Sequence, residues 1–359
     1  MFDRVLEAYG LTNNCTIIPF GNGLINRTWK VTCGAEEYIL QKINHQVFIN
    51  PQAIADNIGN IHQYLQQHFP AYVLPTPIKN KTGNPLLHLI GDGYYRITPF
   101  VKDSHSVDAA TSTRQAYEAA MSFGQFTHLL SGFNANQLQI TLKDFHDLTL
   151  RYRQFQQAIK EGNQERITQT QHLILELQAQ QSIAEMYQSI CDSNDFKTRV
   201  THHDTKISNV LFDEEDNSIC VIDLDTVMPG YFISDVGDMM RTYLSPVSEE
   251  EADFSKIEVR EDYFKAIVSG YLHYMNDDLT QKEKEAFVYA GKFMIYMQAL
   301  RFLTDYLNND VYYGAAYANH NLVRAQNQTI LLRKICSKET ELTALVTEAL
   351  ESFEASAAV

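Results

Sequence analysis

The chain has 359 residues, of which 45% are apolar and 20% charged, which is typical of a globular protein with more than one lobe. The net charge of −15 argues against a nucleic-acid surface and offers no attraction to anionic membranes. The five cysteines are scattered without zinc-ligand spacing, which predicts reduced thiols in a cytoplasmic protein. No signal-peptide pattern and no run of about 18 apolar residues is present, so we expect no membrane span.

The first part of the chain has the pattern of a small β-rich unit. Residues 3–10 predict a short helix. Apolar runs at 17–20 and 29–31 flank a loop that contains Gly21 and Gly23, which predicts a β-hairpin. Glycines at such a turn let backbone N–H groups approach a phosphate closely. A Gly-x-Gly turn by itself is more often only a turn.

A further strand, a helix and a second hairpin follow, at residues 37–43, 51–66 and 84–101. The end of this hairpin is an apolar connector to the rest of the chain. In it, Pro99 can accept a hydrogen bond through its carbonyl, and the Val101 N–H can donate one.

From about residue 106 the pattern becomes helical. Segments 109–130, 145–190 and 281–307 carry apolar side chains at helical spacing, as expected for helices of a larger lobe. Arg301 is an exception within the last segment, because a cation among apolar residues needs an anion or several acceptors. Its simplest partner is Asp305, four residues further on.

One polar stretch between these helices has a specific spacing. A loop with His202, Asp204 and Asn209 lies between apolar runs, and a later apolar run ends in Asp223 and Asp225. A hairpin here would bring Asp204, Asn209 and Asp223 together. One carboxylate can accept a proton, while an amide oxygen and a second carboxylate hold a hard cation. This equipment suits magnesium-assisted phosphoryl transfer.

The spacing His-x-Asp-x4-Asn followed by Ile-Asp-x-Asp resembles the aminoglycoside phosphotransferase and choline kinase superfamily. Within it, the chain is particularly similar to the bacterial N-acetylhexosamine 1-kinases, most strongly over 200–241 and 301–324. The resemblance implies an α+β, two-lobed protein-kinase-like fold. The expected N-lobe is β-rich and spans residues 1–101. The expected C-lobe is larger, mainly helical and spans residues 102–359.

The resemblance also implies roles for individual residues. Asp204 would act as the base, Lys206 would meet the transferring phosphoryl group, and Asn209 and Asp223 would hold Mg²⁺. The implied nucleotide contacts are Gly21, Gly23, Asn26, Thr28, Pro99 and Val101. The implied acceptor contacts are Asp204, Asp225, Arg301 and Tyr312.

The expected reaction is ATP-dependent phosphorylation of the anomeric hydroxyl of an N-acetylhexosamine, giving the sugar 1-phosphate. No nucleic-acid or membrane partner is expected, and the sequence leaves the oligomeric state open. Two alternatives remain. The acceptor could be choline, homoserine or an aminoglycoside, or the chain could be a catalytically inactive nucleotide-binding module.

The sequence departs from the family pattern in the N-lobe. Gln41 stands where a strand lysine normally contacts the nucleotide phosphates, and strand alternation directs Lys42 to the opposite face. The helix at 51–66 contains no glutamate to pair with such a lysine. Leu24 stands where the sugar kinases have a polar residue. Further along, we expect Asp235, in the first turn of a helix, to bond the backbone of the catalytic loop.

Overall fold

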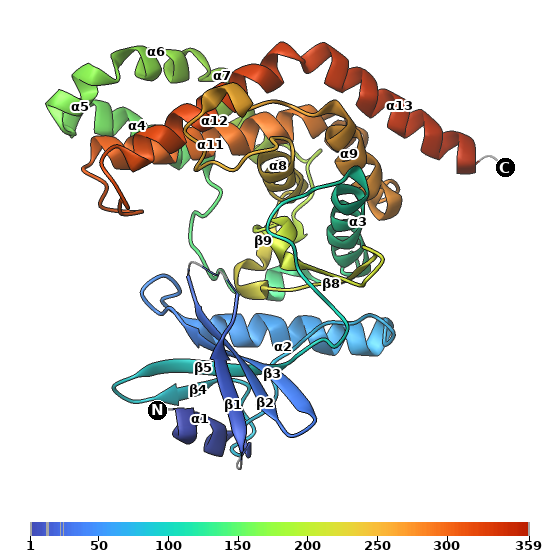
Figure 1. The fold of residues 1–359 in the computed structure, drawn as a ribbon. Coiled ribbons are helices and arrows are strands. Elements are labelled where there is room, and N and C mark those ends of the chain that lie inside the picture. Colours follow the sequence, from blue (N-terminus) through green and yellow to red (C-terminus); the bar gives the residue numbers. More distant parts are fainter. Residues whose placement is uncertain (1, 12–13, 22, 24, 358–359) are drawn as a thin grey trace.

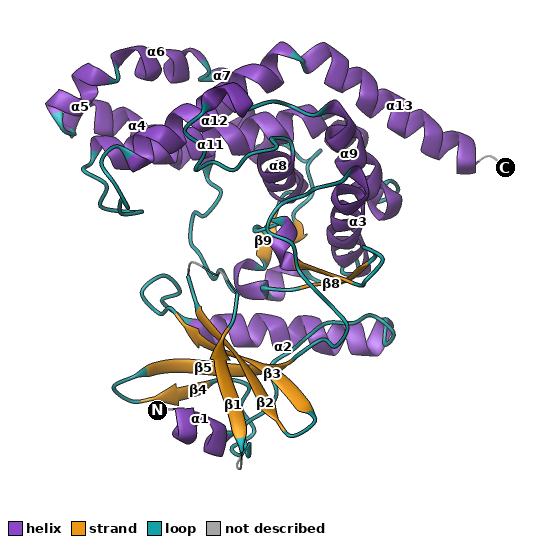
Figure 2. Ribbon diagram, viewed as in Figure 1, coloured by secondary structure: helices purple, strands orange, loops and turns teal. Residues whose placement is uncertain are grey.

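The computed structural model describes residues 2–11, 14–21, 23 and 25–357. Leu24 lies outside these residues. The chain forms two lobes, a small N-lobe built on a sheet and a large helical C-lobe (Figure 1), with the secondary structure mapped in Figure 2. This is the expected two-lobed α+β fold.

The N-lobe contains one antiparallel five-stranded sheet in the order β1-β2-β3-β5-β4. Its elements are α1 (Phe2–Ala8), β1 (Cys15–Pro19), β2 (Arg27–Cys33), β3 (Glu36–Ile43), α2 (Pro51–His68), β4 (Leu87–Leu89) and β5 (Gly93–Pro99). Strand β3 is central and pairs with both β2 and β5, so a residue of β3 has neighbours on two sides.

The two faces of the sheet are covered differently. On one face, Val31, Leu40 and Tyr95 pack with Val5 and Leu6 of α1 in a small core. On the other face lies α2 (Figure 1). Its apolar side chains belong to a large core that continues through the C-lobe. Because side chains alternate along a strand, every second strand residue points toward the C-lobe.

The C-lobe is mainly helical and carries short strands near the N-lobe. Its elements are α3 (Thr113–Leu129), η1 (Ala135–Gln137), α4 (Leu148–Glu161), α5 (Gln164–Gln169), α6 (Gln171–Ala179), α7 (Ser182–Cys191), β6 (Arg199–Thr201), η2 (Ile207–Asn209), β7 (Val210–Phe212), β8 (Ser218–Val221), η3 (Leu224–Thr226), β9 (Met228–Gly230), α8 (Phe232–Tyr243), η4 (Phe254–Lys256), α9 (Glu261–Met275), α10 (Gln281–Glu285), α11 (Phe287–Leu307), α12 (His320–Ser337) and α13 (Glu339–Ala357). The helix expected over 281–307 is therefore two helices, separated at Ala286.

Helices α3 and α9 approach each other closely because each has a glycine at the contact. A Cβ on Gly124 would lie 2.8 Å from the carbonyl oxygen of Tyr271, and a Cβ on Gly270 would lie 2.3 Å from that of Tyr117. Any larger residue at either position would force the helices apart. This packing also supports the predicted catalytic loop, residues 202–209, since the ring of His202 contacts that of Phe123 on α3.

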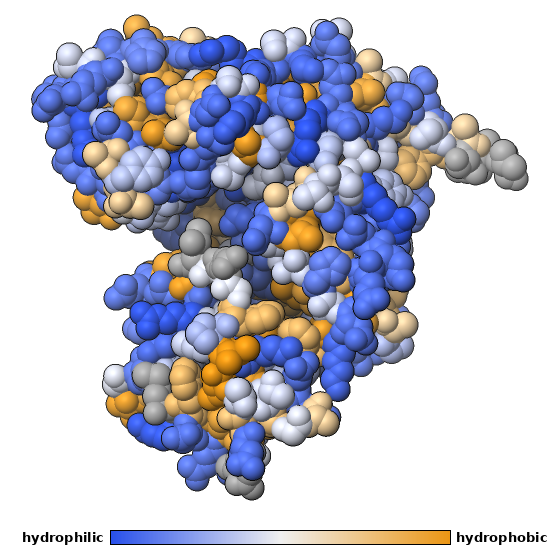
Figure 3. All heavy atoms as spheres, viewed as in Figure 1, coloured by the Kyte–Doolittle hydropathy of each residue, from blue (hydrophilic) through white to orange (hydrophobic). Residues whose placement is uncertain are grey.

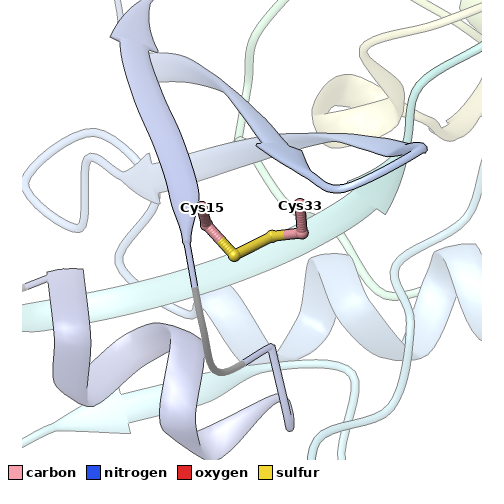
Figure 4. The surroundings of a disulfide bond; sticks show 2 residues. All are labelled: Cys15 and Cys33. Carbon is pink, nitrogen blue, oxygen red and sulfur yellow. A yellow bond between two sulfur atoms is a disulfide. The ribbon is translucent and has the colours of Figure 1, made fainter.

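The expectation of five reduced thiols is wrong for one pair. Cys15 on β1 and Cys33 on β2 form a disulfide (Figure 4), while Cys191, Cys220 and Cys336 are free. The two half-cystines are 18 residues apart in sequence but directly opposite in the β1–β2 register, with Cα atoms 4.3 Å apart. Strand pairing creates this proximity, which spacing along the chain does not reveal.

Within the described residues, no helix is both long enough and apolar enough to cross a membrane.

Candidate active site

The predicted catalytic loop is held in place by a carboxylate from helix α8. Asp235 accepts hydrogen bonds from the backbone N–H groups of His202 at 3.0 Å and His203 at 2.7 Å. The Thr205 hydroxyl donates to the Asp235 carbonyl at 2.6 Å. The expected structural role of Asp235 is therefore confirmed. These bonds hold His203 in the left-handed region, at φ = 66°, so the loop turns sharply just before Asp204.

Asp204 lies at the centre of the loop with two polar neighbours. The Asn209 side chain donates to its carbonyl at 2.8 Å and to its carboxylate at 3.1 Å, and the Lys206 ammonium lies 3.1 Å from the other carboxylate oxygen. Burial opposes ionisation of Asp204, but Lys206 and His202 outweigh it and hold the pKa of the carboxyl below its usual value. Asp204 is therefore a carboxylate that can accept a proton.

Strands β7 and β8 bring Asp223 to the same place. Val210 pairs with Val221, and the Ile222 N–H donates to the Asn209 carbonyl at 2.9 Å. Asp223 follows directly, with φ = 59°, a left-handed conformation that costs energy for a residue other than glycine. The expected hairpin is thus present, and it places the metal candidates Asn209 and Asp223 on adjoining strand ends.

The charge around Asp223 fits a bound cation. Burial and the nearby carboxylates of Asp225 and Asp204 raise the pKa of Asp223 to about 7. A divalent cation would relieve this crowding of negative charge. Carboxylate and amide oxygens, as offered by Asp223 and Asn209, are donors that Mg²⁺ accepts, usually together with phosphate oxygens and water. The residues present therefore fit magnesium.

Asp225 connects the C-lobe to the N-lobe. It is 2% exposed, and one of its oxygens accepts from Asn26 of the β1–β2 loop at 2.7 Å. Its other oxygen accepts from Arg96 on β5 at 2.5 Å. Both carboxylate oxygens are therefore engaged by the N-lobe. The surface is hollowed between the lobes (Figure 3), so this contact closes one part of a wider cleft.

Sequence reasoning did not single out Arg96. Its guanidinium donates through Nε to Gln41 at 2.8 Å, and Gln41 donates to Thr28 at 3.4 Å. The three residues are direct partners across β2, β3 and β5 and share the sheet face toward the C-lobe. A lone arginine between Tyr95 and Ile97 in an apolar strand was the available signal.

The usual lysine–glutamate pair is absent, and the polar residues near its two positions have other partners. Lys42 points away from the cleft and pairs with Asp92 at 2.6 Å, as strand alternation predicts. On α2, the buried Asn57 donates to the carbonyl groups of Gln139 and Val227 and accepts from the Gln139 N–H. The buried Asn57 side chain thus links α2 to the main chain of the C-lobe.

The remaining nucleotide candidates lie in the loop after β1 and at the end of β5. Gly21 has φ = 73°, which favours glycine, and a Cβ on Gly23 would lie 3.6 Å from the Asn26 carbonyl oxygen. Pro99 ends β5, and Val101 follows with an N–H that makes no hydrogen bond within the described part of the chain. The structure therefore leaves the Val101 N–H available in the connector.

Arg301 and Tyr312, the two predicted acceptor contacts on and after α11, lie together. The Arg301 guanidinium donates to Gln298 at 2.8 Å and to the Tyr312 hydroxyl at 3.4 Å. Asp305 is not its partner, because that carboxylate accepts from the backbone N–H groups of Tyr312 and Tyr313. Asp305 thus shapes the loop after α11, and within the described residues Arg301 has no carboxylate in ion-pair contact.

An aromatic contact joins this region to the catalytic loop. The ring of His146 lies 5.2 Å from that of His203 and stacks on Phe145, and the Phe145 ring is 5.8 Å from the Arg301 guanidinium carbon. Burial, together with His203 and Arg301, lowers the pKa of His146 well below its usual value, so His146 is neutral. The loop before α4 therefore bridges Arg301 and the segment that carries Asp204.

This fold and loop define a kinase-like phosphotransferase. The sequence profile of the phosphotransferase enzyme family matches residues 16–265, and the chain belongs to that family.

Solved structures with the same fold accompany this match. A microcompartment-associated aminopropanol kinase superposes with a TM-score of 0.64 at 14% identity, over 95% of this chain and 98% of that one. An aminoglycoside phosphotransferase from Alicyclobacillus acidocaldarius subsp. acidocaldarius DSM 446 gives 0.62 at 13%, over 96% of each chain. A spectinomycin phosphotransferase in complex with ADP and spectinomycin gives 0.56 at 12%, over 97% of each. At these identities the likeness shows the shared fold.

Proposed function

We propose that this phosphotransferase moves the terminal phosphoryl group of ATP to the anomeric hydroxyl of an N-acetylhexosamine, such as N-acetylglucosamine or N-acetylgalactosamine. The observation that carries the proposal is the contact of Asp204 with Asn209 and Lys206 beside Asp223. That arrangement offers a base, a cation and metal-ligand oxygens within one loop and hairpin. An inactive nucleotide-binding module would not require all of them.

The residues divide the chemistry between them. The Asp204 carboxylate orients the acceptor hydroxyl and takes its proton as the oxygen attacks the phosphorus, a contribution of roughly 10²–10⁴-fold. Lys206 places positive charge beside the transferring group. Asn209 and Asp223 would hold Mg²⁺, which when bound supplies countercharge to the phosphate oxygens. The phosphoryl–ADP bond breaks, and ADP leaves.

The acceptor side supports a neutral acceptor over an amine. Arg301 and Arg151 both lack a carboxylate partner within the described residues, and burial together with Arg301 lowers the pKa of Arg151. Two neighbouring guanidinium groups repel an ammonium group. They can donate to hydroxyl or amide oxygens, and the exposed ring of Tyr312 can lie against a sugar.

An acceptor panel tests this proposal. We would incubate the protein with magnesium-ATP and N-acetylglucosamine, N-acetylgalactosamine, glucose, aminopropanol, choline, homoserine or kanamycin, and follow ADP release. Phosphorus NMR with proton coupling then locates the phosphate. We expect a product coupled to the anomeric proton. ADP release with an amine acceptor alone would contradict the sugar assignment and leave the phosphotransferase chemistry intact.

A matched pair of variants tests the acceptor contact. We expect Arg301→Gln to lower kcat/KM for the acetylated sugar about 10-fold or more while the KM for ATP stays constant. Arg333→Gln is the control, because Arg333 is exposed on α12 and pairs only with Glu176 among the described residues. Equal kinetics in the two variants would remove Arg301 from the acceptor site.

A further inference from the structure

The N-lobe lacks the cation that kinases of this type place on the nucleotide phosphates. In protein kinases a lysine on the third strand contacts the phosphates and pairs with a glutamate of the next helix. Here β3 carries Gln41 at the cleft face, and α2 contains no glutamate. A triphosphate still needs positive charge close to it. Another residue of the sheet can supply it.

Among the described lysines and arginines of the N-lobe strands, only Arg96 is placed to contact a nucleotide phosphate in the cleft. The strands of the N-lobe sheet carry Arg27, Lys30, Lys42 and Arg96. Arg27 is exposed, and Lys30 and Lys42 form ion pairs with carboxylates of the same lobe. Arg96 is buried, with 5% of its surface exposed, and its ion pair crosses to the metal-binding segment of the C-lobe.

Arg96 stands directly beside the vacant lysine position. It is the register partner of Gln41, one strand over on the same face, and Gln41 accepts from its Nε. Asp225 accepts from its Nη1. The second terminal nitrogen, Nη2, makes no hydrogen bond to any residue that the structure describes. Two of the three guanidinium nitrogens are thus fixed, and the third can donate to a ligand.

Building on the proposed function, we propose that Arg96 binds the β- and γ-phosphates of the nucleotide in place of a strand lysine, with Gln41 and Asp225 as its positioning residues. The planar guanidinium suits phosphate oxygens, with which it forms charge-assisted hydrogen bonds. Asp225 supplies the countercharge that lets Arg96 remain buried before the nucleotide arrives. Asn26, which also binds Asp225, brings the β1–β2 loop to the same point.

A purely structural reading makes a different prediction. If the Arg96–Asp225 pair only ties the lobes together, its loss weakens every nucleotide alike, because the whole cleft loosens. If Arg96 binds phosphates, its loss weakens only nucleotides that carry a β-phosphate. The two roles are therefore distinguished by whether the loss of affinity depends on the number of phosphates that the nucleotide carries.

The experiment measures nucleotide binding by calorimetry, with magnesium and without any acceptor. The probes are AMP, ADP and a non-hydrolysable ATP analogue. We expect Arg96→Gln to bind ADP and the ATP analogue roughly 10- to 100-fold more weakly than the wild type, with AMP affinity unchanged. Lys42→Gln is the control, since it removes a charge from the opposite face of the sheet; we expect it to change none of the three affinities.

A second variant restores the charge on the adjacent strand. In the double variant Gln41→Lys/Arg96→Gln, a lysine stands at position 41 on β3. We expect this double variant to recover part of the ADP affinity that Arg96→Gln loses. If Arg96→Gln does not fold, this double variant carries the test. The proposal requires it to prefer ADP over AMP, and equal affinities for the two overturn the proposal.

Three other results also overturn it. They are unchanged ADP affinity in folded Arg96→Gln, equal weakening of all three nucleotides, and wild-type protein that binds AMP as tightly as ADP. Because no acceptor is present, failure of every sugar to react would contradict the proposed acceptor and leave the role of Arg96 to be judged on these affinities.

Discussion

At the scale of single residues, the predicted catalytic loop shows how burial and charge set different pKa values for neighbouring carboxylates. Asp204, Asp223 and Asp235 are near neighbours in the fold, yet they differ in ionisation. Lys206 keeps the pKa of Asp204 low, whereas burial raises the pKa of Asp223 and that of Asp235 to about 7. Of the three, Asp204 is thus the carboxylate whose lowered pKa keeps it ionised at neutral pH, so that it can accept a proton.

Asp204→Asn tests that role. The amide keeps the size of the side chain but cannot accept the proton, so we expect kcat to fall roughly 10²–10⁴-fold while ADP affinity stays constant. Steady-state kinetics and calorimetry measure the two quantities. Glu214→Gln neutralises an exposed carboxylate of the β7–β8 turn and serves as the control. Near-normal turnover in Asp204→Asn would exclude Asp204 as the base.

The burial of His203 predicts that the free energy of unfolding depends on pH. Burial lowers the pKa of His203 to about 4, and burial also lowers the pKa of His202 and His146. The unfolded chain, with a histidine pKa of about 6.5, therefore binds more protons than the folded one between these values. Stability contributed by His203 is complete above about pH 6.5 and is lost as the pH falls toward 4, by about 3 kcal/mol.

Denaturant unfolding at several pH values between 4 and 7 measures this loss. His203→Asn removes the titrating ring, and asparagine tolerates the left-handed backbone at this position, where φ is 66°. We expect the variant to have a shallower dependence of unfolding free energy on pH, by up to one proton. A slope identical to that of the wild type would show that His203 does not titrate in this range.

At the scale of elements, strand pairing places residues that are distant in sequence opposite each other. It creates the disulfide between β1 and β2 and the row of polar side chains at Thr28, Gln41 and Arg96. Each depends on register, because a shift by one residue would turn the side chains to the other face. The disulfide thus joins β1 and β2 at the end of the hairpin opposite to the loop that carries Asn26.

The disulfide predicts a thiol count. Denatured, non-reduced protein should present three titratable thiols, from Cys191, Cys220 and Cys336, and reduced protein should present five. Closure of a short loop stabilises a protein by about 3 kcal/mol in the chain-entropy model, so reduction should also lower the denaturant midpoint. Five thiols without reduction would contradict the pairing. Cys191→Ser is a control that should lower both counts by one.

At the scale of the whole molecule, the two lobes share an apolar core through α2 and also meet through polar contacts beside the cleft. Asn26 and Arg96 contact Asp225, and Asn57 of α2 contacts the main chain at Gln139 and Val227. A nucleotide bound in the cleft would touch both lobes. It should therefore stabilise the folded molecule as a unit.

Thermal unfolding with ADP tests this expectation. At free ADP of 100 times its dissociation constant, the folded state should gain about 2.7 kcal/mol, seen as a higher Tm. Magnesium should increase the gain if Asn209 and Asp223 hold it between the protein and the phosphates. We expect Asp223→Asn to lose the magnesium-dependent part only. A Tm shift in that variant that still grows with magnesium would remove Asp223 from the metal site.

The sequence by itself determined the β-rich first part, the helical remainder and the loop that carries Asp204 and Asn209, and the resemblance of that loop to a known superfamily implied the two-lobed fold. These features are local: hydrophobic periodicity marks each helix and strand, and the loop and hairpin bring together residues fewer than about 25 positions apart. The orientation of Lys42 also followed from strand alternation alone. The roles of the site residues remain predictions, which the variants above address.

Only the tertiary structure decided which distant partners meet. Arg96 and Asp225 are separated by 129 positions, and neither the strand pattern nor the hairpin pattern connects them. The disulfide depended on the register of β1 and β2, and Asp305 turned to backbone N–H groups instead of Arg301. Such contacts arise when packed elements exclude water and each buried polar group must find a partner, a condition set by the whole fold.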